Sequence, residues 1–202
     1  MPDKVDLKKH HKALFAPKKT PQIIDVPPLQ YLMIDGKGAP ESPAFADAIA
    51  ALYPAAYTLK FHCKTSGKGD FVVAPLEALW WADNMAAFVT NQRDDWQWTA
   101  MIMQPDFVSA DDLAVTMAAL EKKKKRVPLH DQLRLETLEE GKVVQVMHIG
   151  PFSDEGPVIA NMHAFAEGEG HALTGKHHEI YLTDMRRTAP EKLKTVLRQP
   201  VT

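Results

Sequence analysis

Apolar and polar residues alternate over residues 177–184, which read HHEIYLTD. Ile180 and Leu182 fall on one side of this segment. The other side carries His177, Glu179, Tyr181 and Thr183. This period of two predicts a β-strand with one buried face. The strand alone does not decide whether the polar row faces bulk water or a ligand cleft.

A longer pattern of strand, glycine turn and helix occurs twice in the chain. Residues 31–53 and 145–167 align without a gap at an offset of 114 positions. The matched pairs are Met33 with Met147, Gly36 with Gly150, Pro43 with Pro157, Ala46 with Ala160, and Ala50 with Ala164. The glycines are expected at turns that tolerate positive φ, and the prolines in the first turn of each helix. The repeat predicts two similar modules related by a pseudo-twofold axis.

Each helix has one apolar stripe at helical spacing. The first stripe is Phe45, Ile49, Leu52 and Tyr53, and the second is Val158, Met162 and Phe165. A third helix is predicted between the modules, with a cap at Ser109 and its C-terminal end at the basic run of residues 121–126. We read that basic run as a solvated helix end that complements the helix dipole rather than as a nucleic-acid patch.

Strands are predicted on both sides of each repeated helix. In module one they cover residues 22–26, 56–61, 70–82 and 95–105, and Pro75 interrupts the third of these. In module two they cover residues 133–138, 177–184 and 193–201, and the first is expected to form a hairpin with the central strand. The predicted class is therefore α+β, with two strand-helix-strand-strand modules and a ligand cleft between them.

These predictions divide the chain into an N-terminal extension, residues 1–20, and one domain, residues 21–202. Module one covers about residues 21–108, the linking helix about 109–126, and module two about 131–202. The chain has 202 residues, of which 45% are hydrophobic and 25% charged, with a net charge of −2. This balance favours neither a nucleic acid nor an anionic membrane as a partner. The charged N-terminus and the lack of a long apolar run predict a cytoplasmic protein.

Several common catalytic arrangements find no support in the sequence. The single cysteine, Cys63, lies in a segment that reads as an exposed loop and has no evident base. The adjacent His177 and His178 point to opposite faces of a strand, so they are not expected to bind one metal ion. There is no GxSxG elbow and no glycine-rich phosphate loop. We therefore expect neither a metal nor a cofactor.

Four tryptophans cluster in two short segments and suggest an aromatic wall. Trp80 and Trp81 are adjacent, so on a strand they face opposite ways, whereas Trp96 and Trp98 share a face. Core packing explains any one of them, but four indoles buried in one small core are uncommon. A wall of indoles suits a planar apolar ligand. If Glu179 faces such a cleft, desolvation would favour proton uptake by its carboxylate.

Long phrases in this order resemble the stand-alone branch of the GyrI-like small-molecule-binding family. They are YLMIDGKGAP, DFVVAPLEALWW, WQWTAMIMQPDFV, MHIGPFSDE and HHEIYLTDMRRTAPEKLKTVLRQPV, and the likeness runs from about residue 5 to residue 202. The resemblance implies the paired-module fold that is also found in SOUL haem-binding proteins. It also implies a buried pocket glutamate, which the HEIY phrase places at Glu179.

The resemblance further implies a site and a reaction. Trp81 and Trp98 are expected as aromatic walls, and Tyr57, His148 and Phe152 as further ligand contacts. Two departures from the family pattern are Met185 in place of an expected proline and the loop GEGH at residues 168–171. Some members of this branch hydrolyse the strained cyclopropane of cyclopropanoid genotoxins and so protect cells. Here Glu179 would activate water and Tyr181 would donate a hydrogen bond to the dienone oxygen.

Three functions remain open from the sequence. The first is a cofactor-independent hydrolase that opens strained planar electrophiles. The second is a module that senses or sequesters aromatic or cationic drugs without turnover. The third, inhibition of DNA gyrase by direct contact, has no dedicated surface signal in the sequence. The oligomeric state is not indicated.

Overall fold

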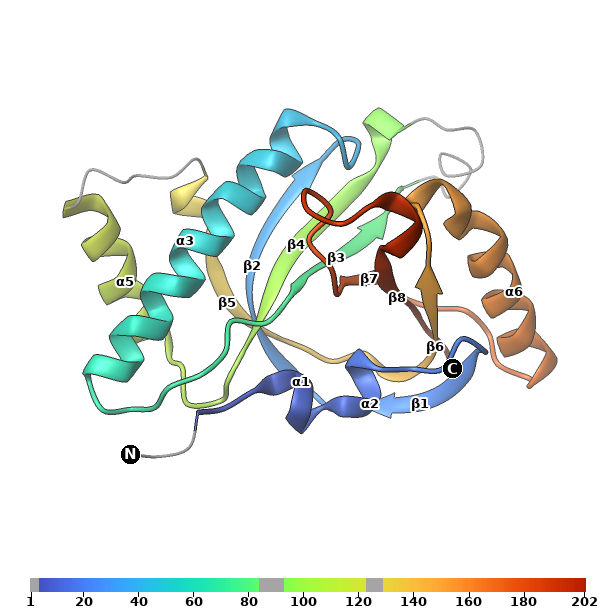
Figure 1. The fold of residues 1–202 in the computed structure, drawn as a ribbon, viewed down its shortest axis with the longest axis horizontal. Helices are drawn as coiled ribbons and strands as arrows, with labels where there is room; N and C mark the ends of the chain where they lie inside the picture. The colour runs from blue at the N-terminus through green and yellow to red at the C-terminus, as the bar shows by residue number, and fades with distance from the viewer. Residues whose placement is uncertain (1–3, 84–92, 123–128) are drawn as a thin grey trace.

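A computed structural model describes residues 4–83, 93–122 and 129–202, and within them the chain forms one eight-stranded antiparallel sheet whose three longer helices lie on one face (Figure 1). The strands are β1 (Gln22–Val26), β2 (Leu29–Lys37), β3 (Leu76–Trp81), β4 (Gln97–Gln104), β5 (Arg134–Leu138), β6 (Gly141–Ile149), β7 (His177–Tyr181) and β8 (Lys194–Pro200). The longer helices are α3 (Pro43–Thr65), α5 (Ala110–Lys122) and α6 (Glu155–Gly168), and two short helices, α1 (Leu7–His10) and α2 (Lys12–Phe15), precede β1.

The strand order confirms the repeat. It runs β1-β6-β8-β7-β3-β4-β2-β5, so each strand of the first module has its counterpart at the mirrored position of the second. The two halves meet where β3 pairs with β7, with Ala78 opposite Glu179. The pseudo-twofold axis therefore passes between β3 and β7 and places the polar row of β7 at the centre of the molecule.

The predicted hairpin between β5 and β6 is wrong, because the first strand of each module pairs with the second strand of the other module. β1 pairs with β6 and β5 pairs with β2. Val26 lies opposite Gly141 and Leu29 opposite Leu138, so one antiparallel register continues through both pairs. The ladder bends where the two prolines of residues 27–28 interrupt one strand, because proline cannot donate a ladder hydrogen bond. This bent ladder ties the two ends of the sheet together.

The helix α3 is longer than predicted, and it replaces the strand expected at residues 56–61. Ser42 caps its first turn by accepting a hydrogen bond from the Phe45 amide at 3.3 Å. The helix then continues through Pro54 to Thr65. Its buried residues are Phe45, Ala48, Ala51, Leu52, Ala55, Ala56, Leu59, Lys60 and Cys63. Burial of this continuous stripe outweighs the hydrogen bond that Pro54 cannot donate.

Three further expectations need correction. Cys63 is fully buried inside α3 instead of lying in an exposed loop. The strand predicted over residues 70–82 is limited to β3, which starts directly after Pro75. Gly36 does not have positive φ, whereas Gly150 does, at 148°. Gly36 is needed for a different reason, since a Cβ there would lie 2.1 Å from the Trp98 ring.

The N-terminal residues and the linking helix pack as parts of the same body. Leu7, Leu14 and Phe15 of α1 and α2 belong to the main core. Ser109 and Asp112 form reciprocal hydrogen bonds at the start of α5, which agrees with the predicted cap. Residues 123–126 of the basic run lie outside the described residues. In the described part of the chain, no helix is both long and apolar enough to cross a membrane.

Candidate functional site

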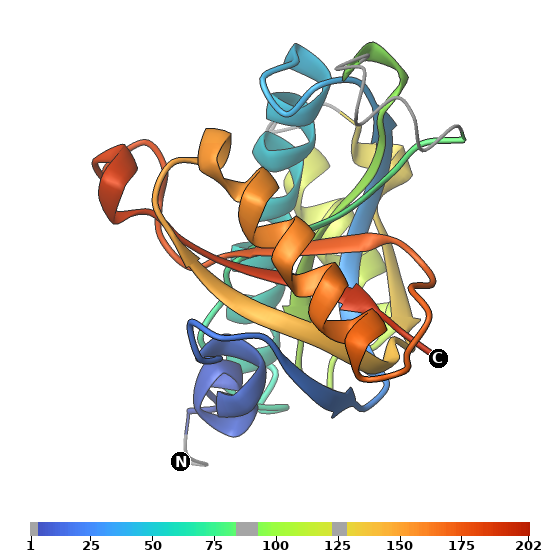
Figure 2. The same ribbon diagram turned by 90° about the vertical axis from the view of Figure 1, so that its right-hand side faces the viewer.

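The polar row of β7 faces the helices and is largely shielded from bulk water. Across the sheet, Glu179 lies opposite Ala78 of β3 and Leu197 of β8. Leu197 packs with Met162 of α6, which covers this face of the second module, and Figure 2 shows α6 running across it. The Glu179 side chain keeps 16% of its surface exposed. The carboxylate therefore lies at a partly open position on the helix-covered face.

A hydrogen-bonded chain holds this carboxylate in place. The Trp80 indole N–H donates to the Tyr181 hydroxyl at 3.0 Å, and that hydroxyl donates to Glu179 Oε2 at 2.7 Å. Burial, and after it the charge of Glu179, raises the pKa of Tyr181 well above its usual value, so the phenol stays protonated. Tyr181 thus orients the Glu179 carboxylate. The sequence analysis expected the Tyr181 hydroxyl to donate to a ligand oxygen, but in the structure it donates to Glu179.

Aromatic rings adjoin this chain on two sides. Phe152, which is 38% exposed, meets the Tyr181 ring edge-on at a centroid distance of 5.9 Å. Phe45 of α3 packs against Trp80 at 5.1 Å, and Trp96 packs edge-on against Trp80 at 6.0 Å. The predicted residues Glu179, Tyr181 and Phe152 are therefore brought together, with Trp80 as the nearest indole.

A second carboxyl group lies beside Glu179. Glu155 is the first residue of α6 and only 6% exposed. Its burial, and then the charge of Glu179, raises the pKa of Glu155 to about 9. Glu155 is consequently neutral at pH 7 and able to donate a proton. A carboxyl group kept neutral beside a second carboxyl group is a common arrangement for acid–base chemistry.

Unpartnered polar atoms are concentrated between α6 and the strands β7 and β8. They are His163 Nε2 and both ring nitrogens of His177, which are buried and have no hydrogen bond within the described residues. His177 Nε2 lies 3.5 Å from Glu179 Oε1, too far for a good hydrogen bond. Because buried polar groups are nearly always hydrogen-bonded, such a concentration marks a place suited to a ligand or solvent.

We call this group of residues the α6–β7 site and define it as Glu155, His163, His177, Glu179 and Tyr181. Burial lowers the pKa of His163, and the nearby His177 lowers it further, so His163 is neutral at pH 7. Among the residues that the structure describes, no cluster of three or more His, Cys, Asp or Glu side chains could hold a metal ion.

The two predicted tryptophans lie apart from this site. Trp81 is on the opposite face of β3, where the Lys176 ammonium lies 3.3 Å from the centroid of its ring. Trp98 shares the face of Trp80 but is fully buried, edge-on to Phe45 at 5.1 Å and against Gly36. In this structure Trp98 is a core residue. The indole linked to Glu179 through Tyr181 is Trp80, instead of the predicted Trp81 or Trp98.

The other two predicted contacts lie on elements other than β7. Tyr57 lies on α3 instead of a strand, is 49% exposed, and stacks on Tyr53 at 6.4 Å between ring centroids. His148 is buried on β6 opposite Thr195, with its Nε2 atom 3.1 Å from the Pro151 carbonyl oxygen. Thr195 in turn lies opposite Tyr181, so His148 is two strands away from the Glu179–Tyr181 pair.

Sequence reasoning missed Glu155 and His163. Acidic residues are favoured in the first turn of a helix, so Glu155 read as an ordinary helix-start residue. His163 was one of nine scattered histidines with no spacing that set it apart. The one sequence signal was the eight-residue separation of Glu155 and His163, which places both on the same face of α6.

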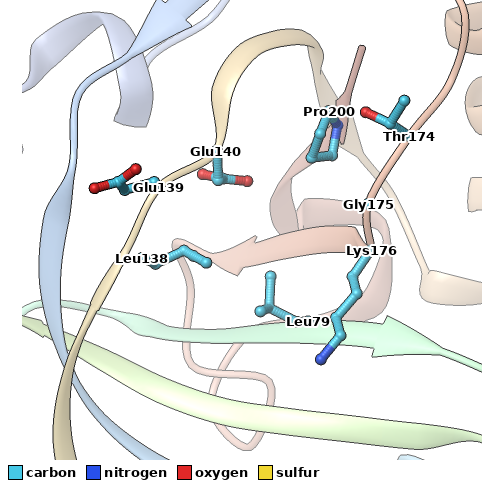
Figure 3. Close-up of a pocket in the computed structure, with 8 residues that line it drawn as sticks. All are labelled: Leu79, Leu138, Glu139, Glu140, Thr174, Gly175, Lys176 and Pro200. Carbon is cyan, nitrogen blue, oxygen red and sulfur yellow. The ribbon is translucent and has the colours of Figure 1, made fainter. Parts of the chain in front are cut away.

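A separate cavity of about 360 Å³ lies on the other side of the sheet (Figure 3). Its lining residues are Leu79, Leu138, Glu139, Glu140, Thr174, Gly175, Lys176 and Pro200. Leu79 lies opposite His178, so the cavity and the α6–β7 site occupy opposite faces of β3 and β7. None of the predicted site residues lines this cavity, and its polar floor residue Glu140 is already paired with His178 and Arg198.

The GyrI-like small-molecule-binding domain model matches residues 19–202. The chain therefore belongs to the GyrI-like small-molecule-binding family, and the resemblance read from the sequence is confirmed. A search of curated proteins found no match. Members of the family are defined by the binding of small molecules, and this class fits a site in which aromatic rings adjoin two carboxyl groups.

Three solved structures from Listeria innocua are similar over nearly the whole chain. One, an uncharacterized conserved protein, is 44% identical, with a TM-score of 0.92, and covers 98% of this chain and 100% of its own. A second is described as a hydrolase, with 44% identity, a TM-score of 0.88 and the same coverage. A third, also described as a hydrolase, has 42% identity and a TM-score of 0.90, and covers 99% of this chain and 100% of its own.

More distant structures share only the fold. The C-terminal domain of EcmrR is 10% identical with a TM-score of 0.58, over 91% of this chain and 97% of that domain. At that identity the likeness shows the paired-module architecture and carries no inference about its ligand.

Proposed function

We propose that this protein binds planar hydrophobic small molecules beside Glu179 and hydrolyses strained electrophiles, such as cyclopropanoid genotoxins, for the protection of the cell. The observation that carries the proposal is the buried hydrogen-bonded chain from Trp80 through Tyr181 to Glu179. It fixes a carboxylate beside the Tyr181 and Phe152 rings, at a partly shielded position where it can accept a proton. The two Listeria proteins described as hydrolases support a hydrolytic reaction.

The proposed reaction needs one base and one acid. Glu179 takes a proton from a water molecule, whose oxygen bonds to the strained methylene carbon. The cyclopropane C–C bond breaks, and its electron pair moves through the ring to the dienone oxygen. That oxygen takes up a proton and becomes a phenol. Glu155, neutral at pH 7, is the group able to supply this proton, and the proton on Glu179 restores Glu155 through solvent.

Glu179→Gln tests the proposal most directly, because it keeps the size of the side chain and removes its basicity. We expect ring opening of a cyclopropanoid substrate to slow by 10²- to 10⁴-fold, the usual contribution of a general base. Ring-opened product is measured by mass spectrometry under single-turnover conditions. The exposed acid Glu167, also on α6, gives the matched control Glu167→Gln, which should keep full activity.

The alternative function is drug binding without turnover. It predicts that wild-type protein and Glu179→Gln both retain the compound unchanged, with binding seen by quenching of tryptophan fluorescence. Equal rates of ring opening in the wild type and Glu179→Gln would also remove Glu179 from the mechanism.

A further inference from the structure

The α6–β7 site has the shape of a strip. Glu155, Ile159 and His163 follow one another at four-residue spacing along one face of α6. Opposite them, Glu179 and His177 follow at two-residue spacing along one face of β7. Glu155 to His163 covers about 12 Å along the helix axis, at 1.5 Å per residue. The strip therefore extends well beyond the two carboxyl groups.

The two ends of this strip differ in chemistry. At the Glu155 end, the Tyr181 and Phe152 rings supply aromatic surface. At the other end, His163 Nε2 and both nitrogens of His177 are buried and have no hydrogen bond within the described part of the chain. An unsatisfied buried polar group is unfavourable, so a ligand group that pairs with these nitrogens gains affinity.

Charge favours a neutral group at the histidine end. Burial keeps His163 neutral at pH 7, and Glu155 is neutral for the same reason. The neutral His163 imidazole offers one donor and one acceptor, which matches a group that both donates and accepts. A carboxamide has this property, whereas a carboxylate only accepts and an alkyl group does neither.

We propose that His163 and His177 form a polar subsite that binds a neutral carboxamide-type group of the ligand, whose aromatic body contacts Tyr181 and Phe152. This inference rests on the proposed binding of planar hydrophobic molecules but does not need their hydrolysis. It predicts that the ligands of this protein have an aromatic end and a hydrogen-bonding end.

The test compares two matched probes, pyrene-1-carboxamide and 1-methylpyrene, in fluorescence titrations at pH 7. We expect wild-type protein to bind the carboxamide about tenfold more tightly, which corresponds to ~1.4 kcal/mol. In His163→Phe and in His177→Phe this preference should fall below about threefold, while the affinity for 1-methylpyrene stays unchanged or rises. His163→Gln, which keeps hydrogen-bonding atoms, should retain part of the preference.

The control variant is His10→Phe, which replaces an exposed histidine of α1 far from the strip in sequence and should keep the full preference. Folding of every variant is checked by circular dichroism. If both probes bind wild-type protein equally well, or if the histidine variants keep the full preference, the polar subsite is wrong and the proposed function stands. If neither probe binds, the proposed ligand class fails together with the subsite.

Discussion

The two neighbouring histidines of β7 have opposite surroundings. His177 faces α6, and neither of its ring nitrogens has a hydrogen-bond partner in the described structure. His178 faces the other side of the sheet and is fully buried, with Nδ1 2.9 Å from Glu140 Oε1 and Nε2 3.0 Å from Glu77 Oε2. Two consecutive residues of one strand thus differ in that the His178 nitrogens have hydrogen-bond partners and the His177 nitrogens do not.

The His178 side belongs to a buried ionic network that links both modules. Arg198 of β8 donates to Glu140 Oε2 at 2.8 Å, to Gln145 Oε1 at 3.2 Å and to the Leu14 carbonyl oxygen at 3.2 Å. These contacts join the β5–β6 corner, β6, β8 and the N-terminal helices. Because both ring nitrogens of His178 are paired, its role is structural, whereas the unpartnered ring nitrogens of His177 indicate a binding role. The comparison teaches that burial alone does not identify a binding residue. What separates the two histidines is whether their ring nitrogens already have hydrogen-bond partners within the protein.

The largest expected effect comes from replacing each histidine by phenylalanine, a side chain of similar size. His178→Phe should lower the free energy of unfolding by about 3–5 kcal/mol, because it removes the hydrogen bonds of two buried carboxyl groups, Glu77 and Glu140. His177→Phe should not lower it, because no hydrogen bond is lost and two buried unpartnered nitrogens are removed. Both values are obtained from urea denaturation at pH 7. Equal losses in the two variants would contradict the comparison.

An intermediate effect is expected at Glu155. The folded protein raises the pKa of this carboxyl to about 9, so ionisation of Glu155 above its unfolded pKa disfavours folding. The stability it contributes is present at low pH and is lost as pH rises toward 9. Glu155→Gln should therefore raise the free energy of unfolding at pH 8 by about 0.5–2 kcal/mol, as is common when a strained site is relieved.

Glu167→Gln, at an exposed position of the same helix, is the control for this gain and should leave stability at pH 8 unchanged. A Glu155→Gln protein that is less stable than wild type at pH 8 would show that the Glu155 carboxyl is a favourable ionised group.

The smallest expected effect is a dependence of the free energy of unfolding on pH that comes from His178 in the buried network. Glu140 above all, by its charge and its hydrogen bond, raises the pKa of His178 against the opposing effect of burial. The stabilisation is complete below the unfolded pKa of histidine, about 6.5, and is lost as pH rises through the higher folded value. The slope cannot exceed ~1.4 kcal/mol per pH unit for one proton.

The slope is measured in the Glu155→Gln background, which removes the declining contribution of the Glu155 carboxyl over this pH range. It should be absent when His178→Phe is added. A slope that survives His178→Phe would assign it to another group.

Much of the fold was predictable from local sequence. The alternation at β7 and the capped start of α3 at Ser42 depend on near neighbours in the chain. The repeat is found by comparing two segments of the sequence at an offset of 114 positions. The end of α3 was not predictable, because Pro54 normally ends a helix and only burial of the residues beyond it, such as Leu59, keeps the helix intact. The β5–β6 hairpin also failed, because the partner of β5 lies more than 95 residues away on β2.

The sequence by itself determined the family and the paired modules, because the repeat and the long motif phrases can be read directly from the chain, and the family resemblance pointed to Glu179 as a buried acid. Tertiary structure alone decided that Trp80 contacts Tyr181, that Trp98 fills the core, and that Glu155 and His163 join the site. Those outcomes depend on which face of α6 packs on β7, and that packing is set by the burial of Met162 against Leu197, residues 35 positions apart. No pattern within either element encodes this contact.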